Sequence, residues 1–139
     1  MNYGTFGGAI VLRLDPGEEI LASLKQLCER EGVTLATVQG IGAVNRAVLG
    51  LFDPATKQYS ANAIETNLEI VSLAGNVTAM GGAVYLHLHM AVADARARVF
   101  GGHLSEAVVS ATAEIVVTRM EGAVERRFSE EVGLNLITI

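Results

Sequence analysis

The alternation of apolar and polar residues predicts one helix near the start of the chain and strands over most of the rest. A first strand is expected at Gly8–Leu14, where apolar residues occupy every second position. A helix should follow, with Asp15 as its capping residue, Pro16 at its first position and Gly32 as its C-terminal cap. Its apolar stripe consists of Ile20, Leu21, Leu24, Leu27 and Cys28.

From position 33 onward, short runs rich in Val, Ile, Thr and Ala predict a succession of strands. They are expected at Val33–Gly42, Ala43–Phe52, Gln58–Ile64, Leu68–Asn76, Ala83–Ala93, Arg98–Leu104 and Ala107–Arg119, with weaker signals at Glu125–Phe128 and Leu134–Ile139. A turn is expected at Asp53–Lys57 and a loop at Asn76–Gly82. This order predicts an α+β fold, an antiparallel-rich mixed β-sheet flanked by one main α-helix. Residues 1–139 contain no repeat or linker, so we expect one domain.

The chain is poor in charge for its length. Hydrophobic residues make up 50% of its 139 residues and charged residues 18%, against about 25% in a typical domain. Either many strands are buried on both faces, or other subunits cover part of the surface. The net charge is −5, and acids dilute the densest basic spots, Arg126-Arg127 and the pair Arg96 and Arg98. Unassisted nucleic-acid binding, which relies on a basic stripe, is therefore not expected.

Other features predict the cellular setting. Cys28 is the only cysteine, so no internal disulfide can form, and its place on the helical stripe predicts a small core residue. The segment Met1–Leu14 lacks a signal-peptide pattern, and no stretch approaches the ~18 apolar residues of a membrane span. We therefore expect a soluble cytoplasmic protein without a membrane partner.

All three histidines lie between positions 87 and 103, in a predicted hairpin. In the strand Ala83–Ala93, alternate residues form a continuous apolar face, and His87 and His89 both project from the other face. If residues 95–97 form a three-residue loop, His103 on the returning strand lies directly opposite His89. The sequence therefore predicts that the three imidazoles share one face.

The apolar residues of the returning strand select this register. It places Phe100 opposite Val92 and Leu104 opposite Leu88, all on the core side. A slip by one residue would expose Phe100, which hydrophobic burial disfavours. A bulge at Gly101-Gly102 would alter this count.

Three imidazoles suit Zn²⁺ or another late divalent metal and leave a coordination position for water or a ligand. A carboxylate usually orients such histidines, and Glu114 is the candidate for that role, since it shares a strand face with Ser110 and Thr112. The simpler interpretation is that the histidines are ordinary polar residues on a solvated or intersubunit face.

Blocks of residues spread over the chain carry a family resemblance. They are Gly40–Ala43, Leu49–Asp53 with Lys57–Tyr59, Glu69–Asn76, Tyr85–His89, Ala93-Asp94, Phe100–Leu104 and Thr112–Val116. In this order they resemble the PPC domain, named for plants and prokaryotes conserved. The match runs from the first strand to about Arg119, and the tail after Met120 matches no block.

The resemblance implies a helix-flanked sheet that assembles as a homotrimer. It also implies that residues in the positions of His87, His89 and His103 hold a metal such as zinc in prokaryotic members. In plants the domain follows AT-hook motifs that bind A·T-rich DNA. This chain has no Arg-Gly-Arg core and no basic N-terminal arm, so DNA association would require a partner or a basic surface created by trimerisation.

These observations predict a non-enzymatic homotrimeric module with a three-histidine metal or small-ligand site. It would act through protein partners or a small ligand, as a regulatory member of a family described as DNA-binding. The alternative is a zinc-dependent hydrolase, in which a metal-bound water attacks the substrate and Glu114 is the base. That alternative requires Glu114 within hydrogen-bond reach of the open metal position.

Overall fold

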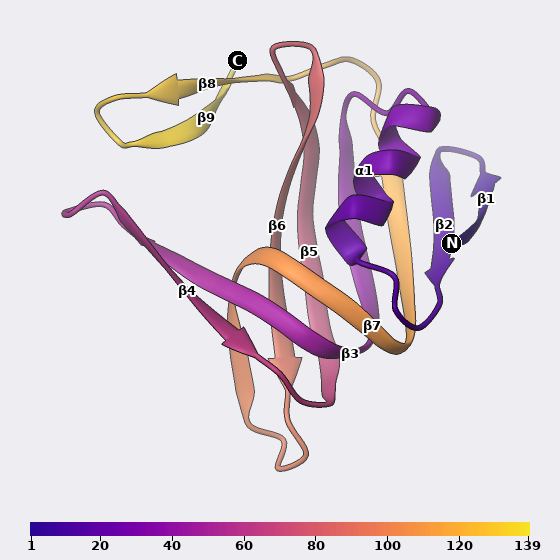
Figure 1. Cartoon of the computed structure of the whole chain (residues 1–139). Helices are drawn as coiled ribbons and strands as arrows, with labels where there is room; N and C mark the ends of the chain where they lie inside the picture. The colour runs from indigo at the N-terminus through magenta and orange to yellow at the C-terminus, as the bar shows by residue number, and fades with distance from the viewer.

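Nine strands and one helix make up the fold in the computed structural model, which describes residues 1–139 (Figure 1). The elements are β1 (Asn2–Phe6), β2 (Ala9–Leu14), α1 (Ile20–Arg30), β3 (Ala36–Asp53), β4 (Gln58–Ile64), β5 (Leu68–Met80), β6 (Ala83–Ala93), β7 (Val99–Arg119), β8 (Glu125–Ser129) and β9 (Leu134–Thr138). All strands belong to one sheet, and every pairing is antiparallel except a parallel contact between Ala79 and Glu125. The fold is therefore mostly β, a mixed sheet with one short helix, and the predicted helix-flanked sheet is confirmed in that form.

Two long strands bend without breaking. The predicted strands Val33–Gly42 and Ala43–Phe52 form the single strand β3, and Arg98–Leu104 and Ala107–Arg119 form β7. At the bend of β3, Gly42 has a φ of 146°, and a Cβ there would lie 2.3 Å from the Thr112 carbonyl oxygen. Only glycine allows this close approach of β3 and β7.

The bends let β3 and β7 change neighbours along their length. β3 pairs with β5 in its first half, with β4 in its second half, and with β7 along both. β7 pairs with β6 at its start and with β2 near its end. As a result β3, β5, β6 and β7 pair in a closed ring, and the histidines lie on this ring.

One predicted loop and the predicted start of the helix were wrong, and one strand was missed. The segment Asn76–Gly82 is not a loop, because β5 continues to Met80 and the chain reverses at Gly81-Gly82, where φ is 59° and 79°. The strand β1 was not predicted. The helix begins at Ile20, and its cap is Glu19, whose carboxylate accepts the backbone N–H groups of Leu21 and Ala22.

Asp15 does not cap the helix, because the residues after it form a turn. Gly17 has a left-handed φ of 88°, and the Glu18 carboxylate accepts the Asp15 N–H. The predicted C-terminal cap is confirmed. Gly32 has a φ of 61°, and the Val33 N–H donates to the Cys28 carbonyl over 2.9 Å, as expected for a glycine-terminated helix.

The helix covers the inner face of the sheet, where it packs on β6 and β7. Its buried residues are Ile20, Leu24, Leu27 and Cys28, four of the five predicted stripe positions. Burial raises the pKa of the Cys28 thiol to about 11, which agrees with its predicted role as a core residue. At 11 residues, α1 is too short to cross a membrane.

Candidate metal centre

The pairing of β6 with β7 brings the three histidines together. His89 lies opposite His103, and Val92 lies opposite Phe100, as the apolar pattern predicted. No bulge occurs at Gly101-Gly102. The imidazole ring centroids are 5.3–5.5 Å apart, and one ring nitrogen from each residue lies within 4.8 Å of the others. We call His87, His89 and His103 the histidine cluster.

The register was predicted correctly only as far as His103. After this residue β7 leaves β6 and pairs with β3, so Leu104 lies opposite Leu49 and not opposite Leu88. Phe100 was expected in the core but is 40% exposed, with the Arg98 guanidinium over its ring. It lies near the tip of the hairpin, opposite the buried Val92. The alternation of apolar residues therefore did not predict the bend of β7.

The surroundings of the cluster favour the neutral form of His87 and His103. Burial lowers the pKa of His87 below its usual value, and the positive charge of Arg126 lowers it further, as do the other two imidazoles. Burial also lowers the pKa of His103, with a smaller contribution from His89. A neutral imidazole has the free lone pair that a metal ion requires.

These lowered pKa values predict that the metal-free protein loses stability in mild acid. In the unfolded chain the histidines take up protons near pH 6.5, whereas in the folded chain His87 and His103 do so only at lower pH. The stability they contribute is complete above about pH 6.5. It is lost as the pH falls through the lowered, folded-state values.

Urea unfolding of the chelator-treated protein at pH 7.5 and pH 5.5 measures this loss. The variant His87→Asn/His103→Asn lacks both titrating groups, so its stability should change less over the same interval. If the stability of the variant and of the wild type changed equally between the two pH values, His87 and His103 would not be the cause of the loss.

The geometry of the cluster fits a divalent metal. Two nitrogens bound to one zinc ion can be no more than about 4.2 Å apart, twice the Zn–N bond length. The nitrogens lie within 4.8 Å of one another, so small rotations of the imidazoles close the remaining gap. His89 is exposed while His87 and His103 are partly buried, so one side of the cluster is open to a further ligand.

Glu114, the predicted orienting carboxylate, lies far from the cluster. His89 pairs with Ala74, Ala74 with Gln39, and Gln39 with Val116, two residues from Glu114. This path crosses three strand spacings, and Glu114 lines a different pocket from the histidines. The prediction that Glu114 orients the histidines was therefore wrong, because β7 bends away from β6 before it reaches this residue.

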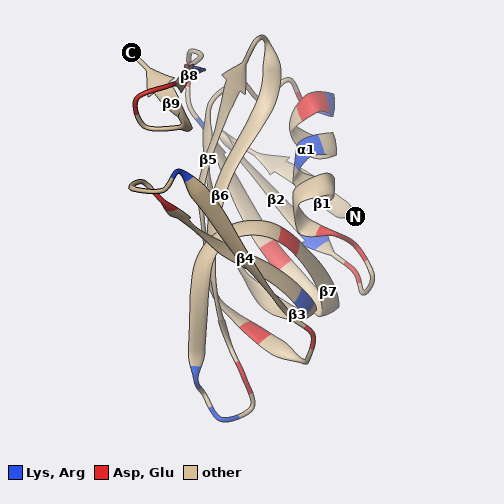
Figure 2. Ribbon diagram, turned by 60° about the vertical axis from the view of Figure 1, so that its left-hand side comes forward, with Lys and Arg blue, Asp and Glu red and all other residues tan.

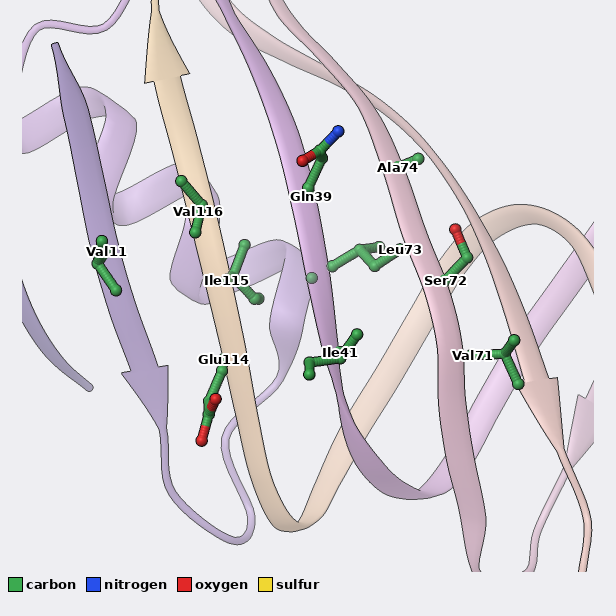
Figure 3. Close-up of a pocket in the computed structure, with 11 residues that line it drawn as sticks. Val11, Gln39, Ile41, Val71, Ser72, Leu73, Ala74, Glu114, Ile115 and Val116 are labelled. Carbon is green, nitrogen blue, oxygen red and sulfur yellow. The ribbon is translucent and has the colours of Figure 1, made fainter.

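Glu114 instead lies on an exposed part of the sheet, on the face opposite the helix. Figure 3 shows it beside apolar side chains on the adjacent strands β2, β7 and β3, with α1 behind them. We call this region the outer face, and its exposed apolar residues are Val11, Ile41, Val71 and Val116.

The sequence did not indicate which polar residues surround the cluster. Arg126 of β8 is 6% exposed, and its Nη2 lies 3.4 Å from His87 Nδ1. Asn76 lies opposite His87 on β5, and its side-chain oxygen accepts a 3.0 Å hydrogen bond from Arg126. The Tyr85 ring lies 4.9 Å from the Arg126 guanidinium carbon. Only a weak strand signal marked the segment that carries Arg126.

Two hairpins enclose a cavity of about 680 Å³ over the cluster. One is β3–β4, which contributes Tyr59, whose ring is edge-on to His103 at 5.9 Å. The other is β8–β9, which Figure 1 shows above the tip of β3–β4. Lys57 at the β3–β4 turn donates to the Glu130 carbonyl and links the two hairpins. The histidines thus lie at the floor of a pocket.

A family model matches most of the chain. It is that of the Plants and Prokaryotes Conserved (PCC) domain, and it covers residues 1–121. The chain is also 34% identical over 122 residues to the bifunctional protein GlmU of a Synechococcus strain. That stretch is 86% of this chain and 18% of the relative, so the chain spans less than a fifth of that protein.

Solved structures match over nearly the whole chain. A candidate DNA-binding protein from Bacteroides thetaiotaomicron is 30% identical, with a TM-score of 0.96 over 99% of this chain and 96% of that one. A metal-containing protein from Archaeoglobus fulgidus is 34% identical, with a TM-score of 0.86 over the same shares of the two chains.

Proposed function

Because the chain belongs to the Plants and Prokaryotes Conserved domain family, abbreviated PPC or PCC, we propose that it is a non-enzymatic metal-binding module that acts as a homotrimer. The histidine cluster holds zinc or a similar divalent ion. The module has a regulatory role, exercised through protein partners or a small ligand.

The observation that carries this proposal is the convergence of three imidazoles on one point of the sheet. Three nitrogen ligands with one open side suit a late divalent metal. A metal-containing relative that is 34% identical over nearly the whole chain adds support. The hydrolase alternative required Glu114 as the general base beside the metal, and Glu114 lies on another part of the sheet.

Metal analysis of protein purified without an affinity tag tests the proposal. The wild-type protein should hold about one zinc ion per chain, as a three-histidine site predicts. The variant His87→Ala/His89→Ala should hold almost none, because one imidazole cannot retain the ion. Mass spectrometry of the metal content and competition with a chelator measure both.

Glu114→Gln is the matched control for this experiment. Since Glu114 lies about three strands from the cluster, its substitution should leave the zinc content unchanged. Equal zinc content in the wild type and the double histidine variant would overturn the proposed site.

The outer face supports the trimeric part of the proposal. Its four apolar side chains are exposed by 42%, 59%, 53% and 37% for Val11, Ile41, Val71 and Val116. They lie on four neighbouring strands of one exposed face, with Gln39 and Glu114 among them (Figure 3). Isolated chains seldom leave such a face in water, and a second copy of the chain would cover it.

A glutamate at position 41 should weaken this assembly. The wild type is expected to sediment with three chain masses of 14.6 kDa each, and Ile41→Glu should shift the mass toward that of one chain, because a charge would be buried at the interface. Ser60→Glu on the exposed strand β4 adds the same charge away from the outer face and should remain trimeric. A monomeric wild type would contradict the proposal.

The charge distribution supports a role that does not rest on direct DNA contact. Figure 2 shows Lys and Arg scattered over separate loops and strands, with acids between them. Several of the arginines are paired with acids, for example Arg46 with Glu106 and Arg119 with Glu31. A protein that binds duplex DNA by itself needs a concentrated basic surface. A DNA-associated role would therefore require a partner.

A further inference from the structure

The pocket over the histidine cluster has a polar floor and apolar walls. The imidazoles, Asn76 and Arg126 form the floor. Leu51 and Phe52 of β3 form one wall, and residues of β9 form the other, namely Leu134, Leu136 and Ile137. A volume of about 680 Å³ is typical of sites for small organic molecules. The pocket therefore has room for such a molecule beside a metal ion.

The pocket carries positive charge without any acid to balance it. None of its 16 lining residues is Asp or Glu, although the chain has 15 acids. Arg126 is nearly buried and belongs to no ion pair.

Its hydrogen-bond partners are all neutral. Nε donates to Thr78 Oγ1 over 2.9 Å, Nη1 to the Asn135 carbonyl over 2.9 Å, and Nη2 to Asn76 Oδ1 over 3.0 Å. These contacts orient the guanidinium but leave its charge uncompensated. A buried cation without a counterion is unfavourable, so an anionic group bound beside Arg126 would be stabilising.

We infer that the pocket binds a small aliphatic monocarboxylate, with its carboxylate between the metal and Arg126 and its hydrocarbon part against Leu136 and Ile137. The inference rests on the proposed function, because the metal supplies part of the positive charge. One carboxylate oxygen takes the open side of the metal and the other accepts from Arg126.

The number of free donors favours a carboxylate over a phosphate. A guanidinium has five N–H groups, and the hydrogen bonds to Thr78, Asn135 and Asn76 leave two of them free. His87 cannot accept from Arg126 while its lone pair holds the metal. No lysine and no second arginine lines the pocket. Inorganic phosphate has four oxygens that require partners, more than the metal and two N–H groups supply, whereas a carboxylate has only two. The apolar walls then suit a short hydrocarbon chain.

Calorimetric titration of the zinc-loaded protein tests this inference with two matched compounds. Isovalerate should bind saturably, and isovaleramide, which has nearly the same shape and no charge, should bind at least about tenfold more weakly. Inorganic phosphate should bind more weakly than isovalerate. Equal binding of the acid and the amide, tighter binding of phosphate, or no saturable binding of isovalerate would overturn the inference.

Two sets of variants locate the ligand. Leu136→Asp places an acid in the pocket wall and should weaken isovalerate binding at least about tenfold by charge repulsion. Ile139→Asp adds the same charge to the exposed end of the chain and should not. Arg126→Met should also weaken binding. Because Leu136 and Ile139 are exposed, their variants keep the test valid if Arg126→Met fails to fold. Unchanged binding in Leu136→Asp would contradict the location.

Zinc content measured in the same samples separates this inference from the proposed function. Full zinc content without isovalerate binding would overturn the inference alone. Absence of zinc would overturn the proposed function, and the carboxylate site would then be judged on the metal-free protein. There, a preference for isovalerate over isovaleramide that Arg126→Met abolishes would support it, and no preference would overturn it.

Discussion

Replacing Gly75 by alanine is expected to lower the free energy of unfolding by about 3 kcal/mol or more. A Cβ at this position would lie 2.0 Å from the His87 carbonyl oxygen and 2.8 Å from the Leu88 Cα. Both contacts are to backbone, so no side-chain rotation relieves them. The strands β5 and β6 would have to separate where Asn76 lies opposite His87. The zinc affinity should therefore fall together with the stability.

Urea unfolding and zinc titration measure the two effects. The matched control is Gly8→Ala, where the nearest atom to the new Cβ is the Arg119 carbonyl oxygen at 4.0 Å, an ordinary contact. We expect this variant to keep both the wild-type stability and the wild-type zinc affinity. If Gly75→Ala unfolded at the same urea concentration as Gly8→Ala, the close approach of the two strands would be refuted.

The second large effect is expected at Leu24, on the side of the sheet away from the histidines. Its side chain is fully buried where α1 packs on β6 and β7. Leu24→Ala would leave a cavity between helix and sheet and should destabilise the protein by about 2–5 kcal/mol. Its zinc content should remain that of the wild type, because His87 and His89 project from the other face of β6.

Thermal unfolding with and without zinc measures this separation of stability from metal binding. Gln26→Ala, on the exposed side of the same helix, is the control and should unfold at the wild-type temperature. Loss of zinc from folded Leu24→Ala protein at room temperature would show that the helix and the metal centre are coupled, contrary to this expectation.

The sequence was informative where a side chain and its partner are close along the chain. Leu88, Met90 and Val92 are buried as the alternation in Ala83–Ala93 predicted, and the short hairpin then aligned His89 with His103. The helical stripe and the cap at Gly32 were predicted for the same reason. In each case the period of the pattern and one short connection determine the geometry.

The sequence did not predict the bends within strands or the contacts between residues that are far apart in the chain. The breaks expected at positions 42 and 105–106 are bends within β3 and β7, and the bend of β7 carries Glu114 away from the cluster. Arg126 contacts residues 39 to 50 positions away. Nothing in its local sequence indicates that contact.

The sequence by itself therefore determined one helix, a largely antiparallel sheet and three imidazoles on one face, because periodicity reports which side of an element each residue occupies. The tertiary structure alone decided what surrounds those imidazoles. In the folded protein, β8–β9 and Arg126 lie over the imidazoles, and Glu114 lies in a different pocket. The pocket over the imidazoles is lined by no acidic residue. These contacts join segments far apart in the chain, and only the packing of the whole sheet brings them together.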